Sequence, residues 1–429
     1  MGNSILDIGV SGLLAAQNQL QITSHNISNI DTPGFNRQRV IQSTNTPQTI
    51  AAGYVGRGVH SASVQRIYSQ FLVSQSLQVQ TQSQSLDTNY AQIKQLDNMF
   101  AEATSGLSPA LQNFFSAIQD VATNPSVVSS RQAMLSNAEA LVSRFQSMDE
   151  RMSQMREGVN TQITSSVVEI NSFANEIAQI NQQIILAEGV SGGEPPNDLL
   201  DQRDDLINQL SKLINTDTVK QSDGSVNVYV GNGHAIVVGS QKLSLETIVS
   251  PDNPDNLTLG LVSANQTIQL PEDQITGGAL GGILAFRRDS LDGAQNALGR
   301  VAMTLAQTFN EQHQLGVDLN GDMGKELFTV SSPKIISAST NNAASNITAS
   351  ISDFGALTTS DYQFSYDGTN YTLTNLSDNS SVSTAVIPSG ATPLTLDGLS
   401  VTGAAILPNE RFLIQPTVNG AKGIAVNIT

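Results

Sequence analysis

An apolar row in the middle of the chain constrains the fold more than any other feature. Apolar side chains recur there at spacings of three or four, separated mainly by Gln, Ser, Asn and Glu. The members of the row are Phe145, Met148, Met152, Met155, Val159, Ile163, Val167, Ile170, Phe173, Ile177, Ile180 and Ile184. This spacing places them on one face of an α-helix, and so long a pattern is typical of a rod-like helix in a bundle. We therefore expect a helical block from Ser126 to Gly189.

The first residues of the chain carry a narrower apolar stripe with a period of seven. Its large residues, hereafter the seam, are Leu6, Leu13, Leu20 and Ile27, and a parallel row of mostly small residues is Gly9, Ala16, Thr23 and Ile30. Pro33 and Gly34 end this helix, because proline lacks the backbone N–H and glycine permits positive φ. So narrow a stripe has no core of its own to bury, so it needs another helix to pack against. The seam therefore predicts assembly through a coiled coil.

Changes in periodicity outline the remaining elements. A polar, glycine-containing stretch up to Gly58 indicates an extended arm or loop, and further helices are expected over 65–100, 109–123, 199–213 and 277–313. Val226, Val228 and Val230 alternate with larger polar residues and precede the turn sequence Gly231-Asn232-Gly233. This pattern predicts a β-hairpin within a small β insert at about 217–275.

The composition shifts after Leu327 to Ser, Thr, Asn and Val, with few long charged side chains. Tyr362, Phe364 and Tyr366 alternate there with polar residues, which predicts strands. We expect a mainly α protein with β structure: an elongated multidomain chain with a long-helix rod or bundle domain, a small β insert and a separate all-β domain. The predicted domains are a terminal assembly helix at 1–34, a helical rod domain at 35–330 and a β domain at 331–429.

Composition narrows the classes of partner and compartment. The 429 residues suffice for two to three domains, and the formal net charge of −17 argues against nucleic acid as the main partner. The absence of cysteine excludes disulfides and thiol chemistry. The amino terminus lacks a basic leader and a continuous apolar run, so it is no cleavable signal peptide, and no apolar run is long enough to span a bilayer.

Candidate chemical sites are weakly supported. The four histidines, His25, His60, His234 and His313, lie in no metal-binding pattern. Asp318, Asn320 and Asp322 imitate the start of a calcium loop, but Met323 occupies the position of the required glycine. A Ser–His–Asp arrangement stays open, although no GxSxG sequence frames a serine. We predict no catalytic, cofactor-binding or metal-binding residues, no cofactor and no enzymatic activity.

Several motifs resemble one family of proteins. Ser11–Ala16 (SGLLAA) and His25–Phe35 (HNISNIDTPGF) resemble the amino-terminal signature of bacterial flagellar rod, hook and hook-associated proteins. The continuation Asn36–Arg39 (NRQR) and the later stretch Gly277–Arg288 (GGALGGILAFRR) are more similar to the hook-associated protein 1 family, the hook–filament junction proteins. Phe309–His313 and Asp318–Asp322 follow in the same order as in that family, so the resemblance extends over most of the chain.

The resemblance implies a structural role in the bacterial flagellum. Copies of the chain would form a ring between hook and filament, with the β domain projecting outward. The implied partners are the chain itself, the hook protein, the next hook-associated protein and an export chaperone, with no nucleic acid and no membrane. The implied location is extracellular, reached through the flagellar type III export route without a cleavable signal peptide.

The resembled family continues beyond the β domain. There a carboxy-terminal helical region returns along the rod, pairs with the first helix and is expected to bind the export chaperone. This chain stops at Thr429, so that region is absent from it. We therefore expect the helix at 5–29 to be poorly ordered or to be paired with a neighbouring molecule.

The predicted assembly interface combines the seam with the polar turn that follows it. Its residues are Leu6, Leu13, Leu20, Ile27, Asn26, Asn29, Thr32, Pro33, Gly34 and Arg37. Helix termination alone explains Pro33 and Gly34, but it does not require the polar residues, and the resemblance places this region in contact with adjacent subunits. Three alternatives stay open: a rod or hook subunit of the same family, a surface adhesin, and a cell-wall hydrolase.

Overall fold

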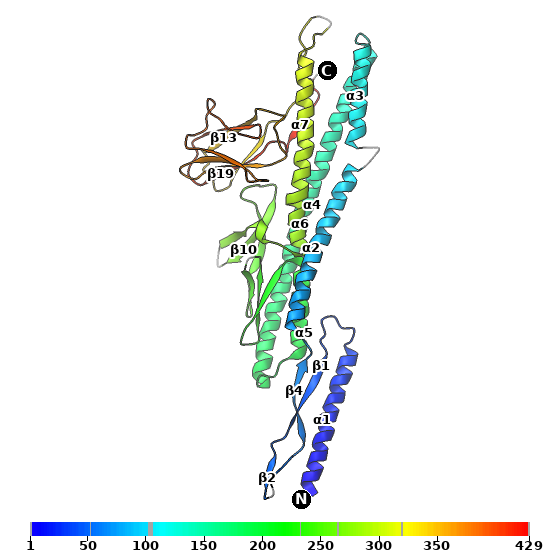
Figure 1. Cartoon of the computed structure of the whole chain (residues 1–429), viewed down its shortest axis with the longest axis vertical. Coiled ribbons are helices and arrows are strands. Elements are labelled where there is room, and N and C mark those ends of the chain that lie inside the picture. The colour runs from blue at the N-terminus through cyan, green and yellow to red at the C-terminus, as the bar shows by residue number, and fades with distance from the viewer. Residues whose placement is uncertain are drawn as a thin grey trace. The chain divides into compact units, whose positions relative to one another are not determined.

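The computed structural model describes residues 2–51, 53–101, 106–231, 233–263, 266–318 and 321–427. The chain forms two compact units. Unit 1 comprises residues 1–87, 164–246 and 259–282, and unit 2 comprises residues 88–163, 247–258 and 283–429. Long helices, a small β insert and a separate β-rich part confirm the predicted fold class (Figure 1). The predicted boundaries of the three domains stay predictions.

The apolar row lies on the longest helix, as the spacing predicts. This helix, α4, runs from Val128 to Ser191 and contributes to both units. Nine members of the row are at most 4% exposed, and Met155, Phe173 and Ile180 are half-buried. The row therefore supplies core side chains along nearly the whole of α4, while the polar faces of the helix point to solvent.

Unit 1 begins with a helix against a β-hairpin. Helix α1 (Gly2–Ser28) lies beside strands β1 (Gln38–Thr44) and β4 (Val59–Arg66), which pair antiparallel with a bulge between Ile41 and Gln42 (Figure 1). Strands β2 (Gln48–Ile50) and β3 (Gly53–Val55) form the far end of the hairpin. The stretch expected as an extended arm or loop thus forms this paired hairpin between two helices, and α2 (Gln70–Phe100) starts five residues later than the sequence predicts.

The small β insert that follows α5 (Asn197–Leu213) forms two sheets, of which the first belongs to unit 1. Helix α5 follows α4, close to the predicted return helix. Buried Asn181 of α4 donates to the carbonyl oxygens of Val226 (2.8 Å) and Gly239 (2.7 Å), which fixes the sheet on the helix. The first sheet has the order β5-β6-β7-β8 and the second β11-β10-β9. Their strands are β5 (Thr216–Lys220), β6 (Val226–Val230), β7 (His234–Val238), β8 (Gln241–Lys242), β9 (Ser244–Val249), β10 (Leu257–Ser263) and β11 (Gln266–Leu270).

The predicted hairpin in this insert is confirmed by the pairing of β6 with β7. Asn232 of its turn lies outside the described residues. A short 3-10 helix (Glu272–Gln274) then leads to α6 (Gly278–Phe286).

The helices of unit 2 surround an aromatic cluster. Helices α3 (Leu107–Thr123) and α7 (Asp292–Gln314) supply Phe114 and Phe309, whose rings lie 5.5 Å apart, and Phe328 packs 5.6 Å from each. The sequence predicts one continuous helix from Gly277 to His313. The structure confirms a helix without a break over this stretch, formed by α6, a π-helical turn at Arg287–Leu291 and α7. Arg287 in the π turn is buried and donates to the carbonyl oxygen of Leu257 (2.8 Å).

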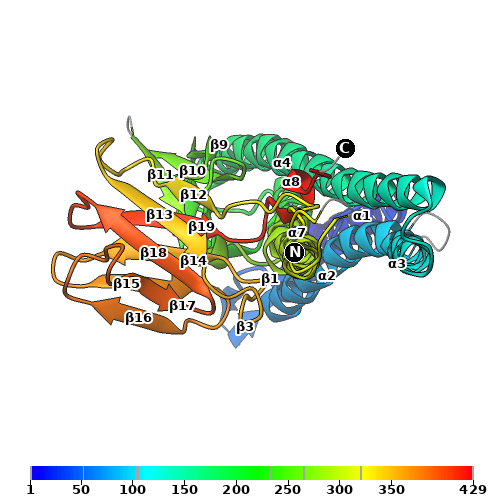
Figure 2. The same cartoon turned by 90° about the horizontal axis from the view of Figure 1, so that it is seen from above.

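The last part of unit 2 is a β-sandwich (Figure 2). A five-stranded sheet of order β12-β19-β14-β15-β16 faces a three-stranded sheet of order β13-β18-β17, and the apolar side chains between them include Phe364, Leu373 and Val401. The strands are β12 (Lys334–Ser337), β13 (Asn346–Ile351), β14 (Tyr362–Tyr366), β15 (Tyr371–Asn375), β16 (Ser381–Thr384), β17 (Leu394–Leu396), β18 (Leu399–Ala404) and β19 (Glu410–Gln415). Helix α8 (Gly420–Gly423) follows. None of the described helices combines the length and apolarity needed to cross a membrane.

A buried carboxyl group ties the sandwich to α7. The Asp361 carboxylate accepts hydrogen bonds from Asn296 Nδ2 and Gln415 Nε2, each at 2.8 Å. Desolvation by burial raises the pKa of Asp361 from 3.8 to about 6, although both hydrogen bonds favour the charged form. Among charged neighbours, Asp292 raises this pKa further and Arg156 lowers it.

This raised pKa predicts that unit 2 loses stability as the pH rises from about 4 to 6. Below 3.8 the carboxyl group is protonated in both states, so its effect is absent there. Above 3.8 the unfolded chain releases the proton more readily, which costs the folded state up to about 3 kcal/mol once the pH exceeds 6. The Asp361→Asn variant should flatten this slope, measured by hydrogen-exchange protection of β14 and β19 after correction for intrinsic rates.

The matched control is Asp378→Asn. Asp378 is exposed and its pKa is lowered by hydrogen bonds from Ser380, so its removal should leave the slope between pH 4 and 6 intact. An Asp361→Asn protein with the wild-type slope would contradict the assignment.

Candidate assembly surface

Helix α1 packs on the hairpin through a small, partly polar face rather than through the seam. Ala15 on this face is 3% exposed, and Asn18 donates to Ser61 Oγ at 3.0 Å. Ser11 Oγ accepts a hydrogen bond from the backbone N–H of Val59 at 3.2 Å. A Cβ atom at Gly58 would lie 2.1 Å from Ser11 Oγ, and the φ of Gly58 is +84°, so glycine is required where strand and helix meet.

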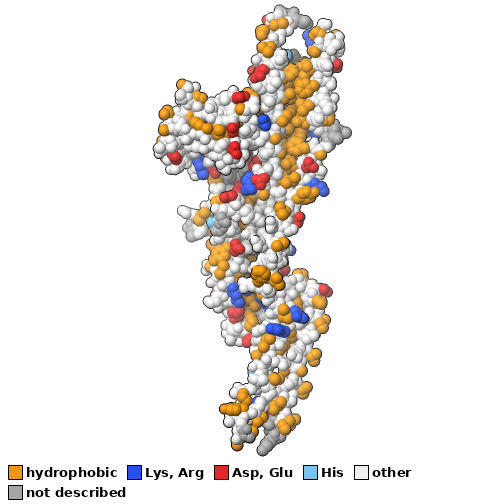
Figure 3. Space-filling model, in the orientation of Figure 1, with side chains coloured by type: hydrophobic (Ala, Val, Ile, Leu, Met, Phe, Trp, Pro, Cys, Tyr) orange, Lys and Arg blue, Asp and Glu red, His pale blue; other side chains and the backbone are white. Residues whose placement is uncertain are grey.

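The seam faces away from the hairpin. Leu6, Leu13, Leu20 and Ile27 are 67–73% exposed, and Ile30 is 78% exposed. Figure 3 shows apolar side chains distributed along the exposed surface of α1. The sequence therefore located the unpartnered stripe, but the hairpin gives the opposite face of α1 an intramolecular partner that was not expected.

The turn that follows α1, residues 29–37, is built by the side chains of the signature. Asn26 and Gln38 close it reciprocally, because Asn26 Nδ2 donates to the Gln38 carbonyl oxygen (2.8 Å) and Asn26 Oδ1 accepts the Gln38 N–H (2.9 Å). Asn29 donates to the carbonyl oxygen of His25 (3.0 Å), and Thr32 donates to Asn29 Oδ1 (3.2 Å). These polar residues thus shape the turn itself.

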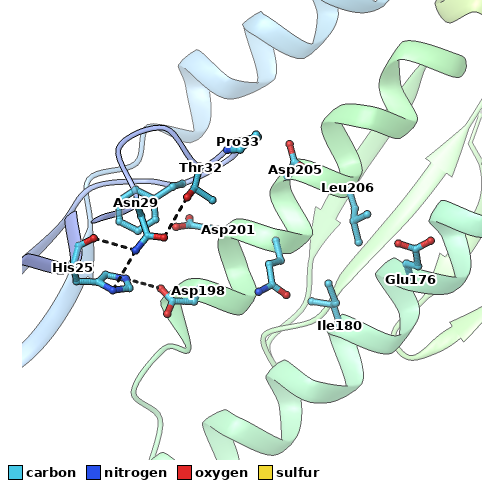
Figure 4. A pocket seen from close by; sticks show the side chains of 12 residues that line it. His25, Asn29, Thr32, Pro33, Glu176, Ile180, Asp198, Asp201, Asp205 and Leu206 are labelled. Carbon is cyan, nitrogen blue, oxygen red and sulfur yellow. Dashed lines mark hydrogen bonds and ion pairs between the residues drawn. The ribbon is translucent and has the colours of Figure 1, made fainter. Parts of the chain in front are cut away.

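The turn lies on the acidic face of α5 (Figure 4). Asn36 donates to both carboxylate oxygens of Asp201, from its backbone N–H (3.0 Å) and from Nδ2 (2.8 Å). A Cβ atom at Gly34, whose φ is +75°, would lie 2.7 Å from the Cβ of Asp205. Gly34 therefore permits both the positive φ and the close approach of the turn to α5.

A buried ion-pair cluster fastens the hairpin to α5. Arg66 of β4 donates from Nη1 to Asp201 (2.7 Å) and Asp204 (2.8 Å), and the Arg66 side chain is 12% exposed. Burial lowers the pKa of Arg66, but the hydrogen bond to Asp201 and the charge of Asp204 outweigh it, so the net pKa is raised. Burial raises the pKa of Asp204, which Arg66 opposes. Neighbouring Arg203 is also buried, and desolvation lowers its pKa.

Phe35 lines three hollows, and two of them differ in the charge of their lining residues. The first, hereafter the acidic hollow, measures about 420 Å³ and is lined by residues of the turn, α4 and α5 that include Glu176, Asp198 and Asp205 (Figure 4). The second, hereafter the basic hollow, measures about 670 Å³ and is lined by residues that include Arg37 and Arg39. Both lie within unit 1.

Sequence reasoning missed the partners of the turn. Asp198, Asp201 and Asp205 recur at spacings of three and four, so the signal for an acidic face on α5 was present in the sequence. Of the predicted interface residues, the seam, Thr32, Pro33, Gly34 and Arg37 are exposed, whereas Asn26 and Asn29 are half-buried within the chain. The use of these residues in assembly stays a prediction.

The other candidate sites have local explanations. His60 Nδ1 lies 2.9 Å from Asn45 Oδ1, and His313 Nδ1 lies 2.6 Å from the carbonyl oxygen of Lys325. Asp318 Oδ1 accepts the backbone N–H of Asp322, and Asn320 lies outside the described residues. Within the described ranges, no group of three or more His, Asp or Glu residues is arranged to hold a metal ion.

Comparison with known protein families gives three matches. The helical domain of the flagellar hook-associated protein FlgK matches residues 93–328, and the D2-like domain of flagellar hook-associated protein 1 matches residues 336–416. The flagella basal body rod protein family matches residues 6–36.

Curated relatives and a solved structure agree with these matches. Flagellar hook-associated protein 1 of Salmonella typhimurium is 36% identical over 430 residues, covering 100% of this chain and 77% of the relative. The Escherichia coli K12 protein of the same name is 34% identical over 429 residues, covering 100% and 78%. The flagellar hook junction protein FlgK from Burkholderia pseudomallei superposes with a TM-score of 0.74 at 38% identity, covering 81% of this chain and 63% of that chain.

The buried cluster predicts that the hairpin depends on Asp201. Replacing Asp201 with Ala leaves Arg66 with one carboxylate and removes two acceptors from Asn36, which should destabilise this part of unit 1 by about 3 kcal/mol. Hydrogen exchange should accelerate in β1, β4 and the turn. Asp217→Ala, at an exposed position of β5, is the matched control. Unchanged protection of β4 in Asp201→Ala would refute the role of the cluster.

Proposed function

Because the chain belongs to the family of flagellar hook-associated protein 1, structural proteins of the hook–filament junction, we propose that its copies assemble side by side between hook and filament. The exposed seam on α1 is the observation that supports this assembly most directly. Four large apolar side chains in one row face solvent on a helix whose other face is already occupied.

The seam favours contact with another helix because exposing apolar side chains to water costs free energy. Burying a Leu or Ile side chain contributes about 1.5–3 kcal/mol, so a row of four stabilises a contact with another helix well beyond a single hydrogen bond. Large exposed apolar rows on helices mark interaction sites. We propose that the seam and the exposed residues of the turn, including Pro33 and Arg37, form the assembly interface.

The proposed partners are further copies of the chain, the hook protein and the next hook-associated protein. A flagellar export chaperone is a fourth proposed partner. We propose an extracellular location in the flagellum, reached through the type III export route without cleavage of a signal peptide. We propose no catalytic activity, since the polar clusters of unit 1 are used in holding the turn and the hairpin.

A strain deleted for this gene tests the proposal. Flagellin should accumulate in the medium as monomer while hooks remain bare, because nothing joins the filament to the hook. Reintroducing the gene should restore attached filaments. Filaments attached to hooks in the deletion strain would refute the junction role.

The seam makes a sharper prediction. Replacing both Leu13 and Leu20 with Asp places charges where an apolar contact is needed, so motility should be lost while the β-sandwich stays folded. The control places the same two charges at Gln19 and Gln21, exposed positions on the flanks of α1, and should keep motility. Electron microscopy of hooks and swimming assays give the readout, with circular dichroism as a check on folding.

Normal motility of the Leu13→Asp, Leu20→Asp strain would show that the seam is not an assembly contact. Loss of motility in the control as well would assign the effect to charge on α1 in general and would equally contradict the role of the seam.

A further inference from the structure

The basic hollow has the chemistry of a docking site. The side chains of Arg37 and Arg39 are exposed, and among the described residues neither guanidinium forms an ion pair or a hydrogen bond. Apolar side chains surround them, with Ile27 67%, Ile30 78% and Ile67 44% exposed. Two unpaired guanidinium groups beside these isoleucine side chains are complementary to a surface that carries carboxylates and aliphatic side chains.

A surface of that kind lines the acidic hollow, to which Phe35 also contributes. The acidic hollow contains Glu176, which is exposed, and Asp198, whose side chain is 62% exposed. Ile180 and Leu206 line the same hollow. Asp198 accepts a hydrogen bond from Gln38 and also lies 3.4 Å from His25 Nε2, and Glu176 accepts a hydrogen bond from Ser172. The Asp198 and Glu176 carboxylates nevertheless remain open to solvent. Unit 1 thus carries two unlike, mutually complementary surfaces.

Charge favours a contact between unlike surfaces of two copies. The chain has 37 acidic and 20 basic residues, so most approaches of one copy to another bring like charges together. An approach that sets Arg37 and Arg39 against Glu176 and Asp198 replaces this repulsion with attraction. A symmetric contact of either hollow with itself would instead oppose like charges.

We propose that the basic hollow of one copy docks on the acidic hollow of the next copy. This rests on the proposed assembly of the chain with itself, and it adds the direction of the contact. An interface that joins two different surfaces is head-to-tail, and repeating it generates a closed ring or an open helix rather than an isolated dimer. The signature turn then sits at the centre of the contact, between the two hollows that it helps to form.

Engineered cysteines test the contact, because the natural chain has none. Two full-length proteins are purified, one carrying Arg39→Cys and the other Glu176→Cys, mixed at high concentration and oxidised. The mixture should give a cross-linked dimer that contains one copy of each. A protein carrying both substitutions should give a ladder of multimers, since each copy then bears both halves of the contact.

The matched control replaces Arg39→Cys with Arg57→Cys, an exposed arginine of unit 1 that lines neither hollow. The 39–176 dimer should form several-fold faster than the 57–176 dimer. It should also weaken at 1 M salt, where the Debye length falls to about 3 Å. Introducing Arg37→Glu into the Arg39→Cys protein should reduce cross-linking. Adding Asp198→Lys to the Glu176→Cys protein should restore it.

Three outcomes would overturn the proposal: cross-linking no faster than in the control, no dependence on salt, or no rescue by the second charge reversal. None of these results bears on the junction role, which the deletion strain decides separately.

Discussion

The apolar row on α4 is the constraint on which both units depend. Val159 and Ile163 belong to unit 2 and Ile170 to Ile184 belong to unit 1, so one helix supplies core side chains to each. Removing these side chains from water is the main favourable term in forming either core. The polar residues of the same helix then take specific tasks. Asn181, fully buried, satisfies backbone groups of the small sheet, and Arg156 bonds to Asn256 and Gln295.

A helix that keeps a large apolar row in solvent needs other means of being held. In unit 1 these means are polar: Asn26 with Gln38, Asn36 with Asp201, and Arg66 with Asp201 and Asp204. Buried ion pairs contribute little net stability, because desolvation offsets their attraction, but breaking one is costly. They therefore define one geometry for the turn and the hairpin. The seam of α1 stays free because the contacts that position α1 use its small and polar residues.

Elements that depend on periodicity within one segment could be predicted from the sequence. Contacts between residues far apart in the chain could not. The row on α4, the seam and the hairpin of β6 and β7 each follow from periodicity within one segment. The pairing of Arg66 with Asp201 joins residues 135 apart, and no spacing rule connects them. The β1–β4 hairpin was missed because burial along its strands does not alternate cleanly, and because Gly58 was interpreted as a breaker. It is instead the residue that lets strand and helix approach.

The row of α4 and the core of the sandwich are mostly buried, whereas α1 exposes its seam, and α2 exposes Phe71, Leu86 and Tyr90 at 63–76%. Large apolar side chains that stay exposed, against the usual pattern of burial, are expected where function requires them. Here the exception has two parts with different physical roles. The seam supplies a non-directional attraction that any apolar helix could satisfy. The acidic hollow and the basic hollow supply charge of opposite sign, and charge complementarity selects partner and register more than it adds affinity. A chain with an excess of carboxylates needs both, because the apolar term alone would not determine which surfaces meet.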